Sequence, residues 1–333
     1  MIPRIQSPEQ RPRWQALLAQ AVNSTDELLR ILQIDPAQLK TRPLDNKFPL
    51  RVPRGFVQRM RKGDCQDPLL LQVLPVPEEA QAAAGFGPDP LDELDSMPVP
   101  GLLHKYQGRA LLTTTGACAI HCRYCFRRHF PYTDANPLAD QWQQAVDYVA
   151  QHNDITELIL SGGDPLTLTD ARLHALTEQL ADIRHLQTLR IHSRLPVVLP
   201  ERVDAGLLAW LASQHLKTVM IIHCNHPNEI DTGVCEAMTR LRHAGVTLLN
   251  QSVLLRGIND NSATLIKLSE RLFAAGVLPY YLHQLDKVEG AAHFEVDLTT
   301  ARQLITEIAA SLPGYLAPRL VQEIPGMPGK TLV

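Results

Sequence analysis

The chain has 333 residues, 32 lysines and arginines against 35 acids, and a formal net charge of −3 at pH 7. This length suffices for one large α/β domain with an appended region, or for two domains. The near-balanced charge, with basic residues scattered among acids, excludes an electrostatic nucleic-acid binder. No apolar segment approaches the roughly 20 residues that would cross a bilayer, and the N-terminus lacks the apolar core of a secretory signal. We therefore expect a cytoplasmic protein.

Residues 1–100 differ in pattern from the rest of the chain. They contain two short helical patterns, at 14–22 and 26–32, and Pro-rich stretches that begin at Phe48 and Val73, followed by a loop at 82–90. These local signals predict a helical, Pro-rich cap over the main domain.

From residue 110 onward, apolar β-rich segments alternate with amphipathic helical segments about every 30 residues. Such alternation predicts right-handed βαβ crossovers and a parallel sheet. Six units fit either an open doubly wound sheet or an incomplete barrel. The predicted strands cover 110–115, 157–161, 188–192, 218–223, 247–253 and 278–284, and the predicted helices cover 140–151, 170–182, 202–213, 229–243, 262–275 and 299–311.

Unusual residues follow nearly every predicted strand. In parallel α/β proteins, ligands bind at the carboxyl ends of the strands, so we expect these residues to share one rim. In strand order they are a cysteine loop, the turn 162–165, the segment 192–194, the segment 223–226, Gln251 and Asp286.

The cysteine loop carries the most specific pattern, Cys118, Cys122 and Cys125. Thiolates favour iron–sulfur clusters, zinc or copper, and a closed structural site normally takes four protein ligands. Three ligands leave one position open to a small molecule. A zinc site completed by His121 or His129, or three ordinary buried cysteines, would fit the same spacing. The other three cysteines are scattered and do not indicate a disulfide framework.

The cysteine loop resembles the motif of the radical S-adenosylmethionine enzymes, and further segments resemble the lysine 2,3-aminomutase family. Together they cover roughly residues 89–330, and the short length and the ending just after Lys330 look most like the bacterial branch that makes β-lysine for modification of elongation factor P. The segments that carry the resemblance are 122–128, 160–165, 226–230, 250–257 and 325–330.

The resemblance implies a partial (β/α)6 barrel at 101–315, an N-terminal helical cap at 1–100 and a C-terminal segment at 316–333 that carries a pyridoxal-phosphate lysine. It implies three cofactors: a [4Fe–4S] cluster on the three cysteines, S-adenosylmethionine on the open iron, and pyridoxal 5′-phosphate. The implied reaction is a 2,3-amino shift that converts L-α-lysine to β-lysine, with the R enantiomer expected from the branch. The cofactors would carry the hydrogen abstraction that side chains cannot perform.

Residue roles also follow from the resemblance. Arg127 would bind the substrate carboxylate, which suits a planar guanidinium, and Asp286 and Glu323 would bind the side-chain ammonium. Glu323 departs from the family's aspartate and reaches one methylene further. Lys330 would form a Schiff base with pyridoxal phosphate, which requires a free amine. The remaining implied contacts are Tyr106, Arg109 and Gln251 to pyridoxal phosphate, and Gly162, Gly163, Asp164 and His223 to S-adenosylmethionine.

Two of these residues and one turn also fit ordinary structural roles. Lys330 can be a solvated lysine near a chain end, Arg109 a surface charge, and the 162–165 turn a simple loop. The expected partners are L-lysine and an external electron donor. We also expect a functional link to a β-lysine ligase and elongation factor P without direct binding, and neither a nucleic acid nor a membrane. Alternatives are the same chemistry on another cationic amino acid or a peptidyl lysine, or a non-enzymatic metal-binding adaptor.

Overall fold

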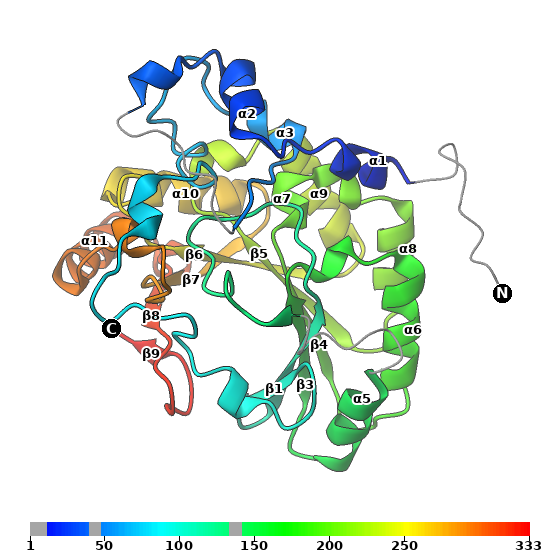
Figure 1. The fold of residues 1–333 in the computed structure, drawn as a ribbon. Helices are drawn as coiled ribbons and strands as arrows, with labels where there is room; N and C mark the ends of the chain where they lie inside the picture. The colour runs from blue at the N-terminus through cyan, green and yellow to red at the C-terminus, as the bar shows by residue number, and fades with distance from the viewer. Residues whose placement is uncertain (1–11, 40–47, 133–141) are drawn as a thin grey trace.

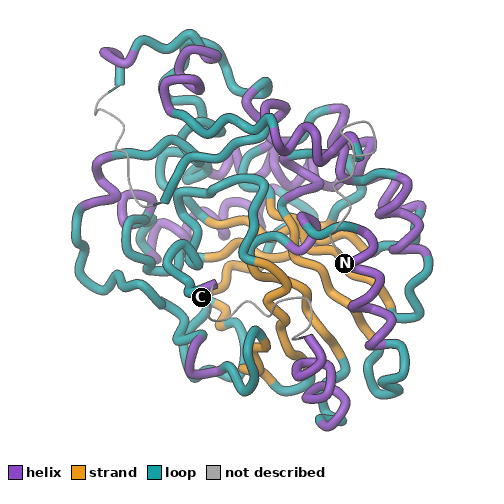
Figure 2. Tube along the Cα trace, turned by 45° about the vertical axis from the view of Figure 1, so that its right-hand side comes forward, coloured by secondary structure: helices purple, strands orange, loops and turns teal. Residues whose placement is uncertain are grey.

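One curved sheet of nine strands forms the centre of the molecule (Figures 1 and 2). The computed structural model describes residues 12–39, 48–132 and 142–333. The strands follow each other in sequence order, with β2 to β8 parallel and with β1 and β9 antiparallel to their neighbours. The strands are β1 (Leu102–Tyr106), β2 (Arg109–Thr115), β3 (Glu157–Gly162), β4 (Thr188–Ser193), β5 (Lys217–His223), β6 (Thr247–Val253), β7 (Leu278–His283), β8 (Arg319–Gln322) and β9 (Thr331–Leu332).

The helices that connect these strands cover the outside of the sheet, as Figure 2 shows. They are α5 (Trp142–Gln151), α6 (Asp170–Leu180), α7 (Leu195–Val198), α8 (Ala205–Ala212), α9 (Thr232–His243), α10 (Ser262–Ala274) and α11 (Leu298–Ser311). Most begin at a side chain that caps the first turn, as Asp204 does for α8 and Asp231 for α9. Since the strand order never reverses, the sheet is a partial barrel and not a doubly wound sheet.

The six predicted strands are confirmed as β2 to β7, and the six predicted helices are confirmed with small shifts at their ends. The helix predicted at 202–213 begins at Ala205, because Pro200 to Arg202 form a separate 3₁₀ turn. Residues 140 and 141 of the first predicted helix lie outside the described residues. Strands β1, β8 and β9 were not predicted, and β8 adds a seventh parallel strand after the six βα units.

The N-terminal region contains α1 (Arg13–Ala19), α2 (Thr25–Leu32) and α3 (Arg54–Val57), which lie above α7 and α9 in Figure 1. The helix predicted at 14–22 ends at Ala19, and Val22 instead pairs with Val52 in an antiparallel bridge. Buried residues of this region share one continuous core with the barrel. No helix among the described residues is long and apolar enough to span a membrane.

Candidate active site

The three cysteines converge in the loop that follows β2. Burial raises the pKa of Cys125 to about 11, and the neighbouring Cys122 adds to the rise. Burial also raises the pKa of Cys118 well above its usual value, and Cys125 and Cys122 add to that rise. The sulfurs are therefore close enough to disfavour one another's thiolate form. A group of bound iron ions would supply the positive charge that stabilises three such thiolates, so the donor set fits a thiolate-bound cluster.

The zinc alternative would need a histidine beside the three cysteines. Within residues 12–39, 48–132 and 142–333, no three His, Cys, Asp or Glu side chains are arranged to hold one metal ion. His121 Nδ1 lies 2.8 Å from Pro49 O, and His129 Nε2 lies 3.1 Å from Glu289 O. A zinc ion needs its ligands around a single point, whereas the irons of a [4Fe–4S] cluster are each bound by a separate thiolate.

Gly162 and Gly163 fix the end of β3 against the cysteine loop. Gly162 has a φ of +118°, and a Cβ on Gly163 would lie 2.4 Å from Ala117 O. The Gly163 N–H donates to Thr115 O at 2.6 Å, and the Asp164 N–H donates to Ala117 O at 2.8 Å. The pair is therefore required for this close backbone contact, and it lies at the rim where the resemblance places S-adenosylmethionine.

The carboxylate of Asp164 is buried and fully occupied by protein donors. It accepts hydrogen bonds from Ser193 Oγ at 2.8 Å and from the backbone N–H groups of Leu166, Arg194 and Leu195 at 3.0, 2.8 and 3.0 Å. Burial nevertheless raises the pKa of Asp164 above its usual value. Asp164 thus ties the turn after β3 to the segment after β4.

Arg194 contacts the cysteine loop directly, whereas the sequence indicates only its place on the rim. Its buried guanidinium donates to Cys122 Sγ, to Tyr124 Oη at 2.7 Å and to Glu229 Oε2 at 3.0 Å. His223 Nε2 lies 3.0 Å from the same Tyr124 hydroxyl. Burial and the charge of Arg194 lower the pKa of His223 to about 3, so His223 is neutral at pH 7.

Lys330 reaches the rim from the C-terminal segment. It immediately precedes β9, which pairs with β8, and its Nζ donates to Glu323 Oε2 at 2.8 Å. The guanidinium of Arg109 lies 4.5 Å from the ring centre of Tyr106. Burial and the neighbouring Glu323 carboxylate raise the pKa of Tyr106. Tyr106, Glu323 and Lys330 therefore form one group, with Arg109 stacked on Tyr106.

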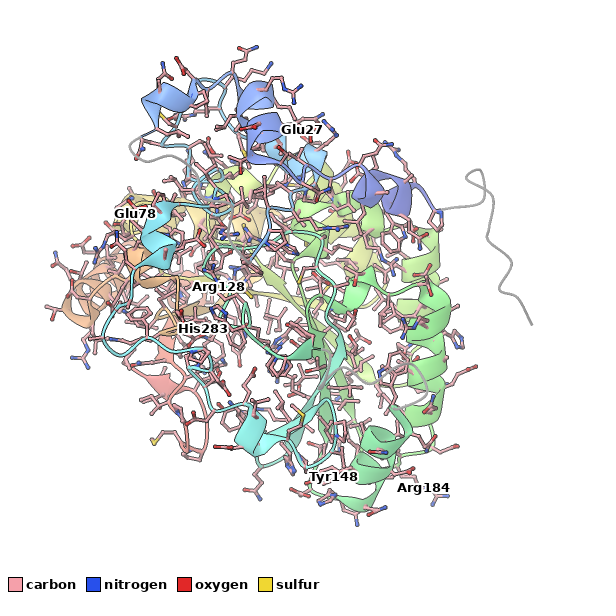
Figure 3. The ribbon with its side chains drawn as sticks, viewed as in Figure 1. Glu27, Glu78, Arg128, Tyr148, Arg184 and His283 are labelled. Carbon is pink, nitrogen blue, oxygen red and sulfur yellow. The ribbon has the colours of Figure 1, made fainter. Side chains whose placement is uncertain are left out.

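Among the described residues, three side-chain nitrogens on the strands themselves are buried without a hydrogen-bond partner: His192 Nε2 on β4, Gln251 Nε2 on β6 and His283 Nε2 on β7. Burial lowers the pKa of both histidines, and the charge of Lys330 contributes to each shift. Unpartnered buried polar nitrogens are costly, so they fit a ligand that would bind there. Figure 3 shows His283 toward the middle of the molecule, away from Tyr148 and Arg184 at its outer edge. These nitrogens, together with Arg109 and Tyr106, fit pyridoxal phosphate, whose phosphate and ring present acceptors beside a lysine.

Asp286 and Glu323 line one cavity of about 380 Å³. Burial raises the pKa of Asp286 to about 7; the charge of Lys330 opposes the rise, and Glu323 adds to it. Arg127 lies apart from this cavity wall, in the cysteine loop, where its guanidinium is buried and paired with Glu93. The predicted carboxylate-binding and ammonium-binding groups thus come from different segments of the same rim.

These features define a radical S-adenosylmethionine protein, and comparison with known proteins agrees. The model of the Radical SAM superfamily matches residues 112–221. An L-lysine 2,3-aminomutase of Escherichia coli K12 is 52% identical over 96% of this chain and 94% of that protein. One from Haemophilus influenzae is 47% identical over 96% and 95%, and one from Clostridium subterminale is 38% identical over 84% and 67%. The chain belongs to the L-lysine 2,3-aminomutase family.

Membership of the Radical SAM superfamily implies a [4Fe–4S] cluster and S-adenosylmethionine as cofactors. Among solved structures, a radical SAM methyltransferase from Sphaerobacter thermophilus has a TM-score of 0.48 at 15% identity, over 66% of this chain and 68% of that one.

Proposed function

We propose that this protein is an isomerase that converts L-lysine to β-lysine by moving the amino group from C2 to C3, with (R)-β-lysine as the product. The observation that carries the proposal is the cavity lined by Asp286 and Glu323, because Glu323 also accepts a hydrogen bond from Lys330 Nζ at 2.8 Å. Two carboxylates in a partly enclosed cavity favour a cationic side chain and disfavour an acidic one. The names of the relatives support the same substrate.

Each end of lysine has a matching group in this arrangement. Arg127 would bind the α-carboxylate, while Asp286 and Glu323 would bind the side-chain ammonium. Lys330 would hold pyridoxal phosphate covalently through Nζ, with Tyr106, Arg109 and Gln251 around the cofactor. The glutamate at 323 reaches far enough to contact Lys330 Nζ. Glu323 would therefore release the ammonium of Lys330 and bind the side-chain ammonium of the substrate in its place.

Cys118, Cys122 and Cys125 would hold the [4Fe–4S] cluster, and the rim formed by Gly162, Gly163, Asp164 and His223 would lie against S-adenosylmethionine. When bound, the cluster with S-adenosylmethionine supplies a hydrogen-abstracting radical, and pyridoxal phosphate supplies the carbonyl group that carries the migrating nitrogen. The protein's own residues bind and orient these groups. Neutral His223 adds a polar contact without repelling a cationic sulfonium.

The proposal extends to the setting of the reaction. An external one-electron donor would reduce the cluster, and a β-lysine ligase would consume the product for modification of elongation factor P. A reducing compartment, the cytoplasm, suits a cluster with an exposed iron. We assign the barrel to 101–315, the cap to 1–100 and the cofactor-lysine segment to 316–333.

The test is anaerobic reconstitution with iron and sulfide, followed by incubation with pyridoxal phosphate, S-adenosylmethionine, dithionite and L-lysine. Chiral chromatography with mass detection should find (R)-β-lysine together with 5′-deoxyadenosine. Deoxyadenosine without β-lysine would retain the radical chemistry and reject lysine as the substrate. Neither product from protein with a full complement of iron and sulfide would reject the proposed function.

A further inference from the structure

Arg127 is held by a buried carboxylate from outside the barrel, Glu93. Glu93 is 4% exposed and Arg127 is 6% exposed. Arg127 Nε donates to Glu93 Oε2 and Arg127 Nη2 donates to Glu93 Oε1, both at 2.7 Å. Arg127 Nη1 donates to Ser161 Oγ at 3.0 Å and makes a longer contact with Gly162 O at 3.5 Å. This two-pronged contact fixes the plane of the guanidinium as well as its position.

Glu93 occupies the Nε–Nη2 edge of the guanidinium and does not occupy the Nη1–Nη2 edge. The guanidinium of an arginine carries five N–H donors in one rigid plane. Glu93 accepts one hydrogen bond from Nε and one from Nη2, and Ser161 accepts one from Nη1. The second N–H of Nη2 makes no hydrogen bond to a described residue, and the second N–H of Nη1 has only the long contact with Gly162 O. A second carboxylate can be bound in the same two-pronged way by that pair.

Glu93 itself is placed by a segment that also contacts the acidic cavity. Its backbone N–H donates to Asp89 Oδ1 at 3.2 Å, and Asp92 before it has a left-handed φ of +47°. Asp89 and Leu91 line the cavity that contains Asp286 and Glu323.

The same segment is bonded to the loop that carries Asp286. Gly87 N–H donates to Lys287 O at 3.0 Å, and Glu289 N–H donates to Gly87 O at 2.9 Å. The segment from Gly87 to Glu93 is thus tied to the acidic loop at one end and to Arg127 at the other. It can set the distance between the two groups proposed for lysine.

We propose that Glu93 is a positioning residue for substrate recognition: it holds the Nε–Nη2 edge of Arg127 so that the Nη1–Nη2 edge faces the α-carboxylate of lysine. The proposal rests on the proposed role of Arg127. The opposite role for Glu93, an internal competitor that must leave before lysine binds, predicts tighter lysine binding without it. The direction of the change in affinity therefore separates the two roles.

The experiment titrates pyridoxal-phosphate-loaded protein with L-lysine and with L-lysine amide, which lacks the carboxylate, and follows the absorption of the bound cofactor. Glu93→Gln should weaken lysine binding by about tenfold, the equivalent of one charge-assisted contact. The dissociation constant of lysine amide should change by less than about twofold. The preference for lysine over lysine amide should therefore fall in Glu93→Gln. Glu93→Asp, which keeps a carboxylate, should retain part of that preference. Lysine binding that stays unchanged or tightens in Glu93→Gln would overturn the proposal.

Glu79→Gln is the matched control. Glu79 is also a buried carboxylate of the N-terminal region, and it pairs with Arg123 and Arg128 instead of Arg127. Its loss should leave the preference for lysine over lysine amide unchanged, although it removes a comparable ion pair. A fall of that preference in Glu79→Gln equal to that in Glu93→Gln would make the Glu93 effect merely structural and reject the proposal.

Arg127→Lys separates this inference from the proposed function. A lysine there cannot form the two-pronged contact, so the preference for lysine over lysine amide should fall. If it falls in Arg127→Lys but not in Glu93→Gln, the role of Glu93 alone is rejected. If it falls in neither variant, Arg127 does not bind the carboxylate, and the proposed roles of Arg127 and Glu93 both fail.

Discussion

Asp286 should make lysine binding depend on pH. Burial raises its pKa to about 7, while Lys330 acts in the opposite direction and Glu323 adds to the rise. Only the ionised carboxylate attracts an ammonium, so the dissociation constant of lysine should level off well above pH 7. It should rise below pH 7, approaching about tenfold per pH unit, because binding then requires proton loss. Binding titrations from about pH 5.5 to about pH 8.5 would measure both the rise and the plateau.

The control for that profile is Asp286→Asn. This variant should bind lysine more weakly at pH 7.5, and the rise below pH 7 should disappear. The low pKa of His223, about 3, keeps it from titrating in the same range. An unchanged pH profile in Asp286→Asn would assign the titration to another group.

Lys330→Ala should separate the two halves of the proposed reaction. It removes the only amine proposed to hold pyridoxal phosphate, so β-lysine formation should fall by at least about 10³-fold. The cysteine loop is untouched, so iron content and deoxyadenosine formation should persist. Lys217→Ala, at the start of β5, changes an exposed lysine outside the proposed site and should behave as wild type. Normal turnover without Lys330 would contradict its assignment.

At the scale of elements, Gly163→Ala should loosen the cysteine loop. The added Cβ would lie 2.4 Å from Ala117 O, a backbone atom, so the loop must shift at a cost of about 1–3 kcal/mol. The reconstituted protein should hold less iron and sulfide per chain and unfold at a lower temperature. Gly55→Ala, in α3, has no atom within 4 Å of the new Cβ and should change neither quantity. Full iron retention in Gly163→Ala would show that the loop does not need this contact.

The elements that the sequence predicted are those whose own residues determine them. Strands such as β6 and helices such as α10 carry a buried face of regular period and a capping side chain, Asn261 in α10. Strands β8 and β9 have four and two residues, too few to show a period, and they exist through pairing with neighbours. Short strands of this kind follow from the fold and not from local sequence.

The same distinction applies to the site. The cysteines are near one another in sequence, so their spacing reveals them. Glu93 and Arg127 are 34 residues apart, and Arg194 and Cys122 are 72 residues apart. No local pattern pairs such residues. The signal available for Arg194 was its position at the end of a predicted strand, and for Glu93 there was none.

At the scale of the whole molecule, the rim is completed by both ends of the described chain. The N-terminal region supplies Gln72, which accepts a hydrogen bond from Arg194 at 2.7 Å, and Glu93, which pairs with Arg127. The C-terminal segment supplies Glu323 and Lys330. The barrel alone therefore lacks part of the proposed site, and substitutions far from the cysteines can affect cofactor binding.

The pairing of β9 in the C-terminal segment can be tested through one backbone hydrogen bond. Val333 N–H donates to Leu320 O at 3.2 Å and closes the pairing of β9 with β8, which places Lys330. Val333→Pro removes this donor, whereas Val333→Ala retains it. The proline variant should retain less pyridoxal phosphate after gel filtration, because Lys330 is less well positioned, while its iron and sulfide content stays at the wild-type value. If Val333→Pro and Val333→Ala lose equal amounts of pyridoxal phosphate, the side-chain packing of Val333 is responsible. If both retain as much as the wild type, Lys330 does not need the pairing of β9.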